Sequence, residues 1–256
     1  MRNLKEAMAY LESETGKAEK RGTLNFEEYL GLAASEPERV LRNIFQLFYD
    51  MIKNYVGEGV DEYPGDPESI GFVKYDCSKL FVEKADNPFF ADRLFANRFI
   101  RQIESLRRGF QQNRIYVYEG PSGCGKSTFL NNLLRTFVDY TNTKSGQIFE
   151  VLWEIDGSLF SDEGDVPKKL IIPCPSHDFP ILVVPKKYRA DFLKRLLPDE
   201  TEIKAKIFGQ KEFEWLFTGE ICATCKSIFE LSLEKLGSID KVFKLLKART
   251  YKFDRR

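Results

Sequence analysis

Apolar residues recur at helical spacing through the first quarter of the chain. Asn25 can cap a short helix, with Glu28 placed three residues on as in a capping box. Ser35 repeats that signal, with Pro37 in the first turn of the next helix. The apolar positions of this next helix are Val40, Leu41, Ile44, Phe45, Phe48, Met51, Ile52 and Tyr55. The pattern predicts one long core helix that packs on two sides and stops at Gly57.

Both helices and strands are expected in the rest of the chain. An aromatic-rich segment from Asp86 starts a helix that continues to about Arg108. Residues 114–119 are rich in β-branched and aromatic residues and predict a strand, and 147–155 predict a second strand that ends in Asp156. The further expectations are a polar mobile loop over 157–167, helices over 186–197, 226–236 and 239–248, and a strand-like alternation over 250–254.

A glycine-rich loop follows the first predicted strand and fits the phosphate-binding pattern G-x-x-x-x-G-K-[ST]. Its residues are Gly120, Pro121, Ser122, Gly123, Cys124, Gly125, Lys126, Ser127 and Thr128. A strand before the loop and a helix after it are the context that this motif requires. Glycines let backbone N–H groups close around phosphates, and the helix start adds partial positive charge. We expect Lys126 to reach the outer phosphates of a nucleoside triphosphate and the Ser127 hydroxyl to help hold Mg²⁺.

Composition narrows the class of protein further. Hydrophobic residues make up 43% of the chain and charged residues 30%, with a formal net charge of zero. No global field therefore draws the chain to nucleic acid or to an anionic membrane surface. No apolar run approaches the roughly 20 residues of a membrane span, and the first residues do not resemble a signal peptide. We expect a cytoplasmic protein that binds neither nucleic acid nor membrane.

Three of the five cysteines form a set with the one histidine of the chain. The set consists of Cys174-Pro175-Ser176-His177 and Cys222-Ala223-Thr224-Cys225. Two short-spaced ligand pairs on separate turns can close a tetrahedral site, so Cys174, His177, Cys222 and Cys225 are expected to hold a structural Zn²⁺ ion. The alternatives are a redox Cys-x-x-Cys and two turns that carry free thiols.

These stretches together resemble the PrkA-type serine protein kinases, whose N-terminal part is an AAA-like P-loop domain. The resemblance is carried by residues 26–30 (FEEYL), 50–52 (DMI), 90–95 (FADRLF), the P-loop, 174–177 (CPSH) and 219–225 (GEICATC). Their order and approximate spacing match from about residue 24 to the last residue. A P-loop alone is shared by very many families, so the flanking segments make the resemblance more specific.

The resemblance implies an α/β fold, an AAA-like P-loop NTPase with a parallel sheet. To this we add a zinc-ribbon-like insertion and divide the chain into a helical N-terminal region (1–85), a P-loop nucleotide-binding core (86–160) and the Cys/His segment with C-terminal helices (161–256). The family implies binding of Mg-ATP and phosphoryl transfer to protein serine or threonine, or ATP hydrolysis. The implied partners are a protein substrate or a partner chain, with a homo-oligomer as one form of assembly.

An AAA-type site also needs an acidic pair on another strand, and this sequence departs from that pattern. No apolar run that ends in Asp-Glu follows the Cys/His segment. Asp156, at the end of the second predicted strand, is the acidic candidate within the chain, to act beside Lys126 in catalysis. Otherwise a partner or a longer chain is expected to complete the site.

Two other functions fit the motifs. One is a small nucleoside or nucleotide kinase in which the zinc-bearing segment closes over the phosphates as a lid. Such kinases usually begin near the P-loop strand, which the long helical N-terminal region fits poorly. The other is a nucleotide-binding interaction module without turnover, in which ATP would stabilise the folded domain.

Overall fold

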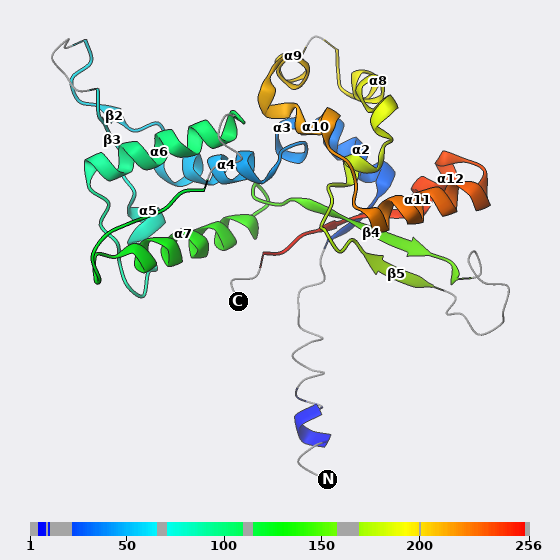
Figure 1. The fold of residues 1–256 in the computed structure, drawn as a ribbon, viewed down its shortest axis with the longest axis horizontal. Helices are drawn as coiled ribbons and strands as arrows, with labels where there is room; N and C mark the ends of the chain where they lie inside the picture. The colour runs from blue at the N-terminus through cyan, green and yellow to red at the C-terminus, as the bar shows by residue number, and fades with distance from the viewer. Residues whose placement is uncertain are drawn as a thin grey trace.

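Two groups of elements, each with its own hydrophobic core, lie side by side in the fold (Figure 1). The fold is that of a computed structural model, which describes residues 5–8, 10, 22–65, 71–109, 115–157, 169–199 and 201–253. We call the two parts the helical group, on the left of Figure 1, and the sheet group, on the right. The P-loop belongs to the helical group and the cysteine set to the sheet group.

The helical group is built around a cluster of aromatic rings. Its elements are α4 (Ile44–Val56), β2 (Val60–Asp61), β3 (Val73–Lys74), α5 (Ser78–Phe81), α6 (Arg93–Arg107) and α7 (Lys126–Thr141), with β2 and β3 paired antiparallel. Phe129, on the first turn of α7, is 2% exposed. The rings around it are those of Phe81, Phe89, Phe95, Phe99 and Tyr118, with centroids 5.1 to 5.5 Å from its own. This packing holds the start of α7 against the segment before α6.

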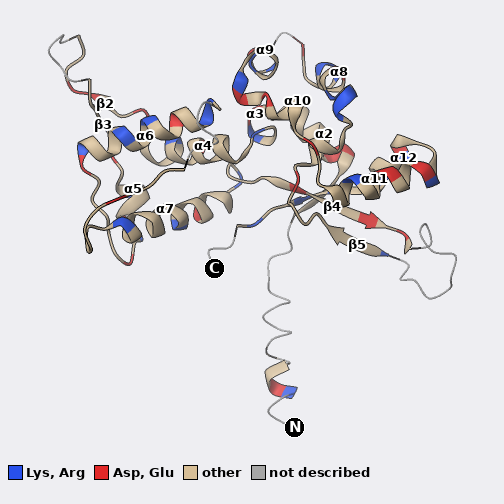
Figure 2. Ribbon diagram, in the orientation of Figure 1, with Lys and Arg blue, Asp and Glu red and all other residues tan. Residues whose placement is uncertain are grey.

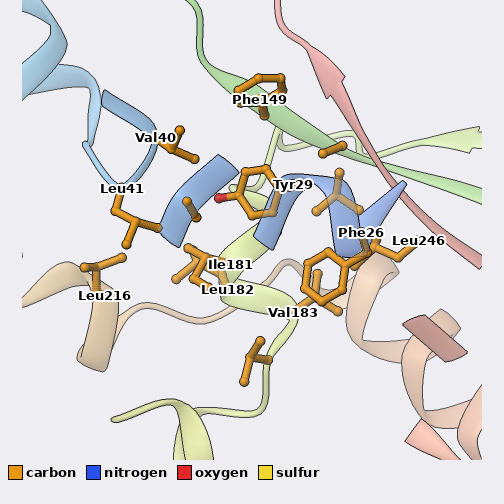
Figure 3. Packing of buried hydrophobic residues seen from close by; sticks show 14 of the residues in the cluster. Phe26, Tyr29, Val40, Leu41, Phe149, Ile181, Leu182, Val183, Leu216 and Leu246 are labelled. Carbon is orange, nitrogen blue, oxygen red and sulfur yellow. The ribbon is translucent and has the colours of Figure 1, made fainter. Parts of the chain in front are cut away.

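The sheet group contains a four-stranded sheet covered by short helices. Its strands are β1 (Thr23–Asn25), β4 (Phe149–Ile155), β5 (Leu170–Pro173) and β6 (Leu246–Thr250), in the order β1-β6-β4-β5. Its helices are α2 (Phe26–Ser35), α3 (Pro37–Val40), η2 (Pro180–Val183), α8 (Lys186–Leu196), α9 (Glu202–Gly209), η3 (Lys211–Phe213), α10 (Trp215–Thr218), α11 (Ala223–Leu236) and α12 (Ile239–Leu245). Phe26 and Tyr29 of α2 pack among residues of η2, β4 and β6 (Figure 3).

The described strands do not form the expected parallel sheet, because every strand pair in them is antiparallel. Nor do residues 115–119 form the expected strand before the P-loop, and Arg114 lies outside the described residues. The side chains of Ile115 and Val117 are 92% and 72% exposed. A strand needs a neighbour for its backbone N–H and C=O groups, and α7 packs among helices, away from the sheet (Figure 1). The chain is therefore a mixed α/β protein with an antiparallel sheet.

Several local predictions are confirmed, and one helix is divided. Helix α2 has the predicted capping box at Asn25, and α4 ends at Gly57. The long helix expected after Ser35 is two helices, α3 and α4. The break occurs because the Asn43 side chain caps α4, accepting hydrogen bonds from the backbone N–H groups of Phe45 and Gln46 at 3.0 Å.

The C-terminal elements differ from expectation mainly at their boundaries. Helix α11 begins at Ala223 instead of Lys226, and the last helix ends at Leu245. Strand β6 starts at Leu246, four residues before the predicted alternation, because its alternate residues Leu246 and Ala248 are fully buried beside β4. Most of the loop predicted over 157–167 lies outside the described residues. The three-part division of the chain stays a prediction.

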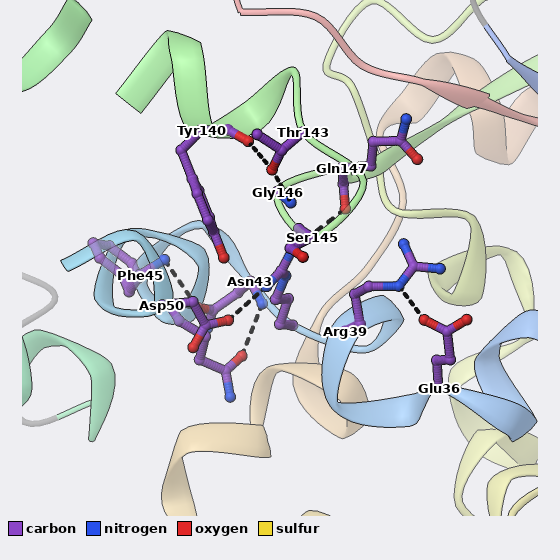
Figure 4. Close-up of polar contacts among 12 residues, drawn as sticks. Glu36, Arg39, Asn43, Phe45, Asp50, Tyr140, Thr143, Ser145, Gly146 and Gln147 are labelled. Carbon is purple, nitrogen blue, oxygen red and sulfur yellow. Dashed lines mark hydrogen bonds and ion pairs between the residues drawn. The ribbon is translucent and has the colours of Figure 1, made fainter. Parts of the chain in front are cut away.

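Arg42, at the junction between α3 and α4, joins the two groups through Asp50 and Ser145, which are both labelled in Figure 4. The side chain is 4% exposed. Its guanidinium donates to Asp50 Oδ2 at 2.6 Å and also to the backbone carbonyl of Ser145, in the loop between α7 and β4. A second link is the ion pair of Arg107 on α6 with Glu212 in η3, at 3.0 Å. Lys and Arg predominate on α6 and α8, whereas several other described elements carry both signs of charge (Figure 2).

Candidate functional site

The glycine-rich loop of residues 120–128 keeps the backbone conformation that its glycines allow. Gly123 and Gly125 have φ angles of 82° and 87°, in the left-handed region that other residues enter at a cost. A Cβ atom on Gly125 would lie 3.2 Å from the Phe89 ring, so the position is also crowded. The sequence motif and the aromatic cluster therefore meet at this glycine.

The N-terminus of α7 is open at the loop. Gly125 is the N-cap residue and no side chain caps the helix. The first N–H groups of an α-helix have no partner within the helix, and the helix dipole places partial positive charge there. A 16-residue helix with this free end offers donors to an anion.

Lys126 lies across the same loop. Its Nζ atom donates to the carbonyl oxygens of Gly120 and Pro121 at 2.7 and 2.8 Å and lies 3.4 Å from Cys124 Sγ. These are uncharged acceptors at the surface, so the ammonium group has no carboxylate to neutralise it among these contacts. An anion at the loop would compete for it through a charge-assisted hydrogen bond.

An aromatic cleft of about 640 Å³ adjoins the loop. Lys126 and Cys124 line it together with Phe89, Phe90 and Tyr118, and the polar side chains in it include Arg98 and Gln102. Phe90 is 77% exposed, so its ring contributes to the cleft and little to the core. A flat heteroaromatic group can enter such a cleft and stack on the rings.

A smaller polar pocket of about 140 Å³ lies at the start of α7. Ser127, the predicted Mg²⁺ ligand, lines it together with Asp86, Asn131 and Arg135. Asp156 lies elsewhere, after β4, at the opposite end of the fold from the start of α7 (Figure 1). The structure therefore brings Asp86, and not Asp156, into one pocket with Ser127.

Three of the four predicted zinc ligands lie close together in the sheet group. One ligand atom each from Cys174, Asp178, Cys222 and Cys225 lies within 4.8 Å of the other three. Cys174 and Cys225 are buried. The hydrogen bond from Cys225 lowers the pKa of the Cys174 thiol to about 7, and its partnership with Cys174 raises the pKa of Cys225. This group could hold a metal ion.

The structure places His177 outside this group. Its Nδ1 atom lies 2.6 Å from Glu150 Oε2, and its ring packs on Tyr251 with centroids 4.5 Å apart. Glu150 is fully buried and also accepts from Arg249 Nη2 at 2.6 Å. His177 has a φ angle of 54°, so the chain turns sharply between Cys174 and Asp178. Of the four predicted ligands, the cysteines come together and the histidine does not join them.

Sequence reasoning missed Asp86, Asp178 and the aromatic cleft. Asp178 directly follows the predicted histidine ligand, so a Cys-x3-Asp pair was visible beside the Cys-x2-His pair. The aromatic residues between 89 and 99 were visible too, but nothing in the local pattern shows that they surround the P-loop helix.

Comparisons with known proteins give one partial likeness. A stretch of 69 residues is 36% identical to the phosphate import ATP-binding protein PstB of Mycoplasmoides gallisepticum. The match covers 25% of this chain and 21% of that protein, so the chain spans about a fifth of the relative. No protein-family model and no solved structure matches the chain. Among the described helices, none has the length and apolar character needed to cross a membrane.

Proposed function

We propose that this chain binds Mg-ATP at the loop formed by residues 120–128. The observation that carries the proposal is the uncapped start of α7, with Lys126 held across the loop only by uncharged groups. Phosphate oxygens would accept from the free N–H groups and draw Lys126 away from the carbonyls of Gly120 and Pro121. The partial likeness to an ATP-binding protein supports the same ligand.

The nucleobase would occupy the aromatic cleft that adjoins the loop. Phosphates bound at the start of α7 would place the rest of the nucleotide within reach of the cleft. The reason is that Lys126 lies across the loop and also lines the cleft. A purine has two flat faces for stacking, and Phe90 and Tyr118 offer rings to it. Gln102 and Arg98 can donate to ring nitrogens or ribose hydroxyls.

Ser127 and Asp86 are the residues that we propose for Mg²⁺. Both line the small polar pocket at the start of α7. Mg²⁺ prefers oxygen ligands and usually keeps several waters, with one or two carboxylates and substrate phosphates beside them. The ion would neutralise charge on the outer phosphates. In this assignment Asp86 takes the role that the sequence suggested for Asp156, which lies at the other end of the fold.

The chemistry that we propose is transfer of the γ-phosphoryl group to a protein serine or threonine, as in the resemblance to PrkA-type kinases, or to water. The bond from the γ-phosphorus to the bridging oxygen breaks, a bond to the acceptor oxygen forms, and the acceptor proton leaves to solvent. Lys126 and the loop N–H groups would act by positioning and by stabilising negative charge.

Binding of ATP without turnover is the second candidate function. The observation that favours it is the position of Asp156, which leaves the predicted acidic partner remote from Ser127 (Figure 1). ATP would then stabilise the helical group as any ligand of the folded state does. Nucleotide binding is common to both candidates.

The experiment that tests both candidates is turnover of γ-labelled ATP with Mg²⁺, with free phosphate resolved from phosphorylated protein. It is run beside calorimetric titration with ATP. Lys126→Ala should abolish binding and any product, and Lys241→Ala, which changes an exposed lysine on α12, should leave both unchanged. Labelled protein would indicate a kinase, free phosphate an ATPase, and binding alone the module without turnover. Unchanged ATP binding by Lys126→Ala would refute the site.

A further inference from the structure

We infer that Cys174, Asp178, Cys222 and Cys225 form a tetrahedral zinc site that fastens the start of α11 to the sheet. The ligand set is three thiolates and one carboxylate, and it excludes the one histidine of the chain. The site lies in the sheet group, apart from the loop proposed to bind nucleotide, and zinc binding there would not require ATP.

The spacing of the ligand atoms fits the ion. A tetrahedral zinc ion with Zn–S bonds of about 2.3 Å separates two sulfur ligands by about 3.8 Å. Cys174 Sγ and Cys222 Sγ lie 3.7 Å apart. The four ligand atoms all lie within 4.8 Å of one another, which leaves one common centre. The two sulfurs are far beyond the roughly 2.05 Å of a disulfide bond.

Both ligand pairs sit on turns that aim them at that centre. Cys222 is the N-cap of α11 and Cys225 is in its first turn, with the Cys225 N–H directed at Cys222 Sγ at 3.4 Å. The other turn follows β5 and is held to β4 by backbone hydrogen bonds from Cys174 N–H to Val151 O at 3.0 Å and from Val151 N–H to Asp178 O at 2.9 Å. Asp178 N–H donates to Cys174 Sγ at 3.3 Å. Anchoring of this kind fixes both turns in advance of binding.

The surroundings offset the negative charge of the four ligands. Cys222 N–H donates to Asp178 Oδ2 at 2.7 Å, and the indole of the buried Trp153 donates to Cys225 Sγ at 3.3 Å. The N-terminal end of the 14-residue α11 adds partial positive charge beside Cys222 and Cys225. Partners that donate to ligand atoms orient the ligands of metal sites in this way.

The turn conformation explains why Asp178 is the fourth ligand. The left-handed backbone at His177 directs that side chain to Glu150 and Tyr251, and the next residue then faces the sulfurs. His177 Nδ1 lies beside Glu150, which a buried ion pair with Arg249 holds in place, and His177 is not in the group of ligand atoms that lie within 4.8 Å of one another. With Asp178 as the fourth ligand, all four positions at zinc would be occupied by protein, as in structural sites.

The test measures zinc in the purified full chain and in three variants at the neighbouring positions His177 and Asp178. We expect a single zinc ion per chain, and a chelator that lowers the melting temperature. His177→Ala should keep the zinc ion, Asp178→Ala should hold it at least about tenfold more weakly in competition with a chromogenic chelator, and Asp178→Cys should restore tight binding. Replacement of zinc by Co²⁺ should give thiolate-to-cobalt charge-transfer bands whose intensity corresponds to three sulfurs.

Three results would overturn the site. One is wild-type protein that contains no zinc and does not take it up after reduction. Another is a Cys174–Cys222 disulfide found by mass spectrometry in freshly purified protein, which would indicate a redox pair. The third is loss of zinc in His177→Ala with full retention in Asp178→Ala, which would restore the histidine as the ligand.

Discussion

At the scale of single residues, Gly125 connects the glycine-rich loop to the aromatic core. The residue has a φ angle of 87° and is the N-cap of α7, and a Cβ atom there would approach the Phe89 ring to 3.2 Å. Both constraints act on the segment that should hold phosphate. Any side chain at this position would therefore disturb both the loop conformation and the packing of the Phe89 ring.

Gly125→Ala should weaken ATP binding and lower stability together. A left-handed alanine costs about 1–2 kcal/mol, and the Phe89 ring must move as well. We expect about tenfold weaker binding, measured by calorimetric titration, with a lower melting temperature. Gly31→Ala is the control, because the position is inside α2 with nothing within 4 Å, and it should stabilise the protein by up to about 1 kcal/mol. Equal effects of the two substitutions would contradict the argument.

Phe90→Ala should reduce nucleotide affinity with little effect on folding. The ring lines the aromatic cleft but is 77% exposed, so its removal leaves no cavity in the core. Loss of one stacking partner is worth about 1–3 kcal/mol. Titration with ATP and with inorganic triphosphate separates the effects, because only binding of the nucleotide should weaken. Equal weakening for both ligands would mean that the base does not occupy the cleft.

At the scale of elements, the start of α4 is set by a buried capping box. Asn43 is 7% exposed and accepts from Phe45 and Gln46, and the Gln46 side chain accepts from the Asn43 N–H at 2.8 Å. Asn43→Ala should lower the free energy of unfolding by about 1–2 kcal/mol in urea denaturation. Asn54→Ala, at an exposed position within the same helix, should change it by less than about 0.5 kcal/mol.

Helix α8 is fastened to its neighbours by one buried guanidinium. Arg189 is 1% exposed and donates to four carbonyls, those of Leu182, Val184, Leu216 and Gly219, at 2.7 to 2.9 Å. Burial lowers the pKa of Arg189 to about 10, which still leaves it protonated at neutral pH. The Arg189 side chain is thus one hydrogen-bond donor shared by backbone carbonyls of η2, α10 and the residues that follow them.

Arg189→Met should therefore destabilise the protein by about 3–5 kcal/mol, because several buried acceptors lose their donor at once. Arg195→Met, on an exposed position of the same helix, should cost less than about 0.5 kcal/mol. Chemical denaturation of both variants measures the difference. A small effect at Arg189 would mean that water replaces the guanidinium at these carbonyls.

At the scale of the whole molecule, Arg42 couples the helical group to the sheet group through its hydrogen bonds to Asp50 and to the Ser145 carbonyl. Arg42→Ala should cost about 2 kcal/mol or more, since a buried charged donor is lost at the junction. Calorimetry should then show a melting transition that is broader than that of the wild-type protein, or divided in two, as the two cores melt less cooperatively. Arg39→Ala, which removes a partly exposed ion pair with Glu36, should cost at most about 1 kcal/mol. A sharp single transition in Arg42→Ala would show that other contacts couple the groups.

Local signals in the sequence were enough to place most helices and the glycine-rich turn before α7. Asn25, Gly57 and Gly125 act through hydrogen bonds and backbone angles that involve residues only a few positions away. Strand pairing is different, because a strand depends on which segment lies beside it. Residues 115–119 have strand-forming side chains, yet they do not form a strand in the structure and are not part of the four-stranded sheet.

The amino-acid sequence by itself predicted the glycine-rich loop and the capping box at Asn25, and it singled out the three cysteines that meet in the sheet group. Only the tertiary structure decided that the sheet is antiparallel, that Asp86 joins Ser127 in one pocket, and that Asp178 replaces His177 beside the sulfurs. The physical reason is distance along the chain. Caps and glycine turns are local, whereas pockets and ligand sets depend on segments about 40 or more residues apart, whose approach is set by packing of the whole core.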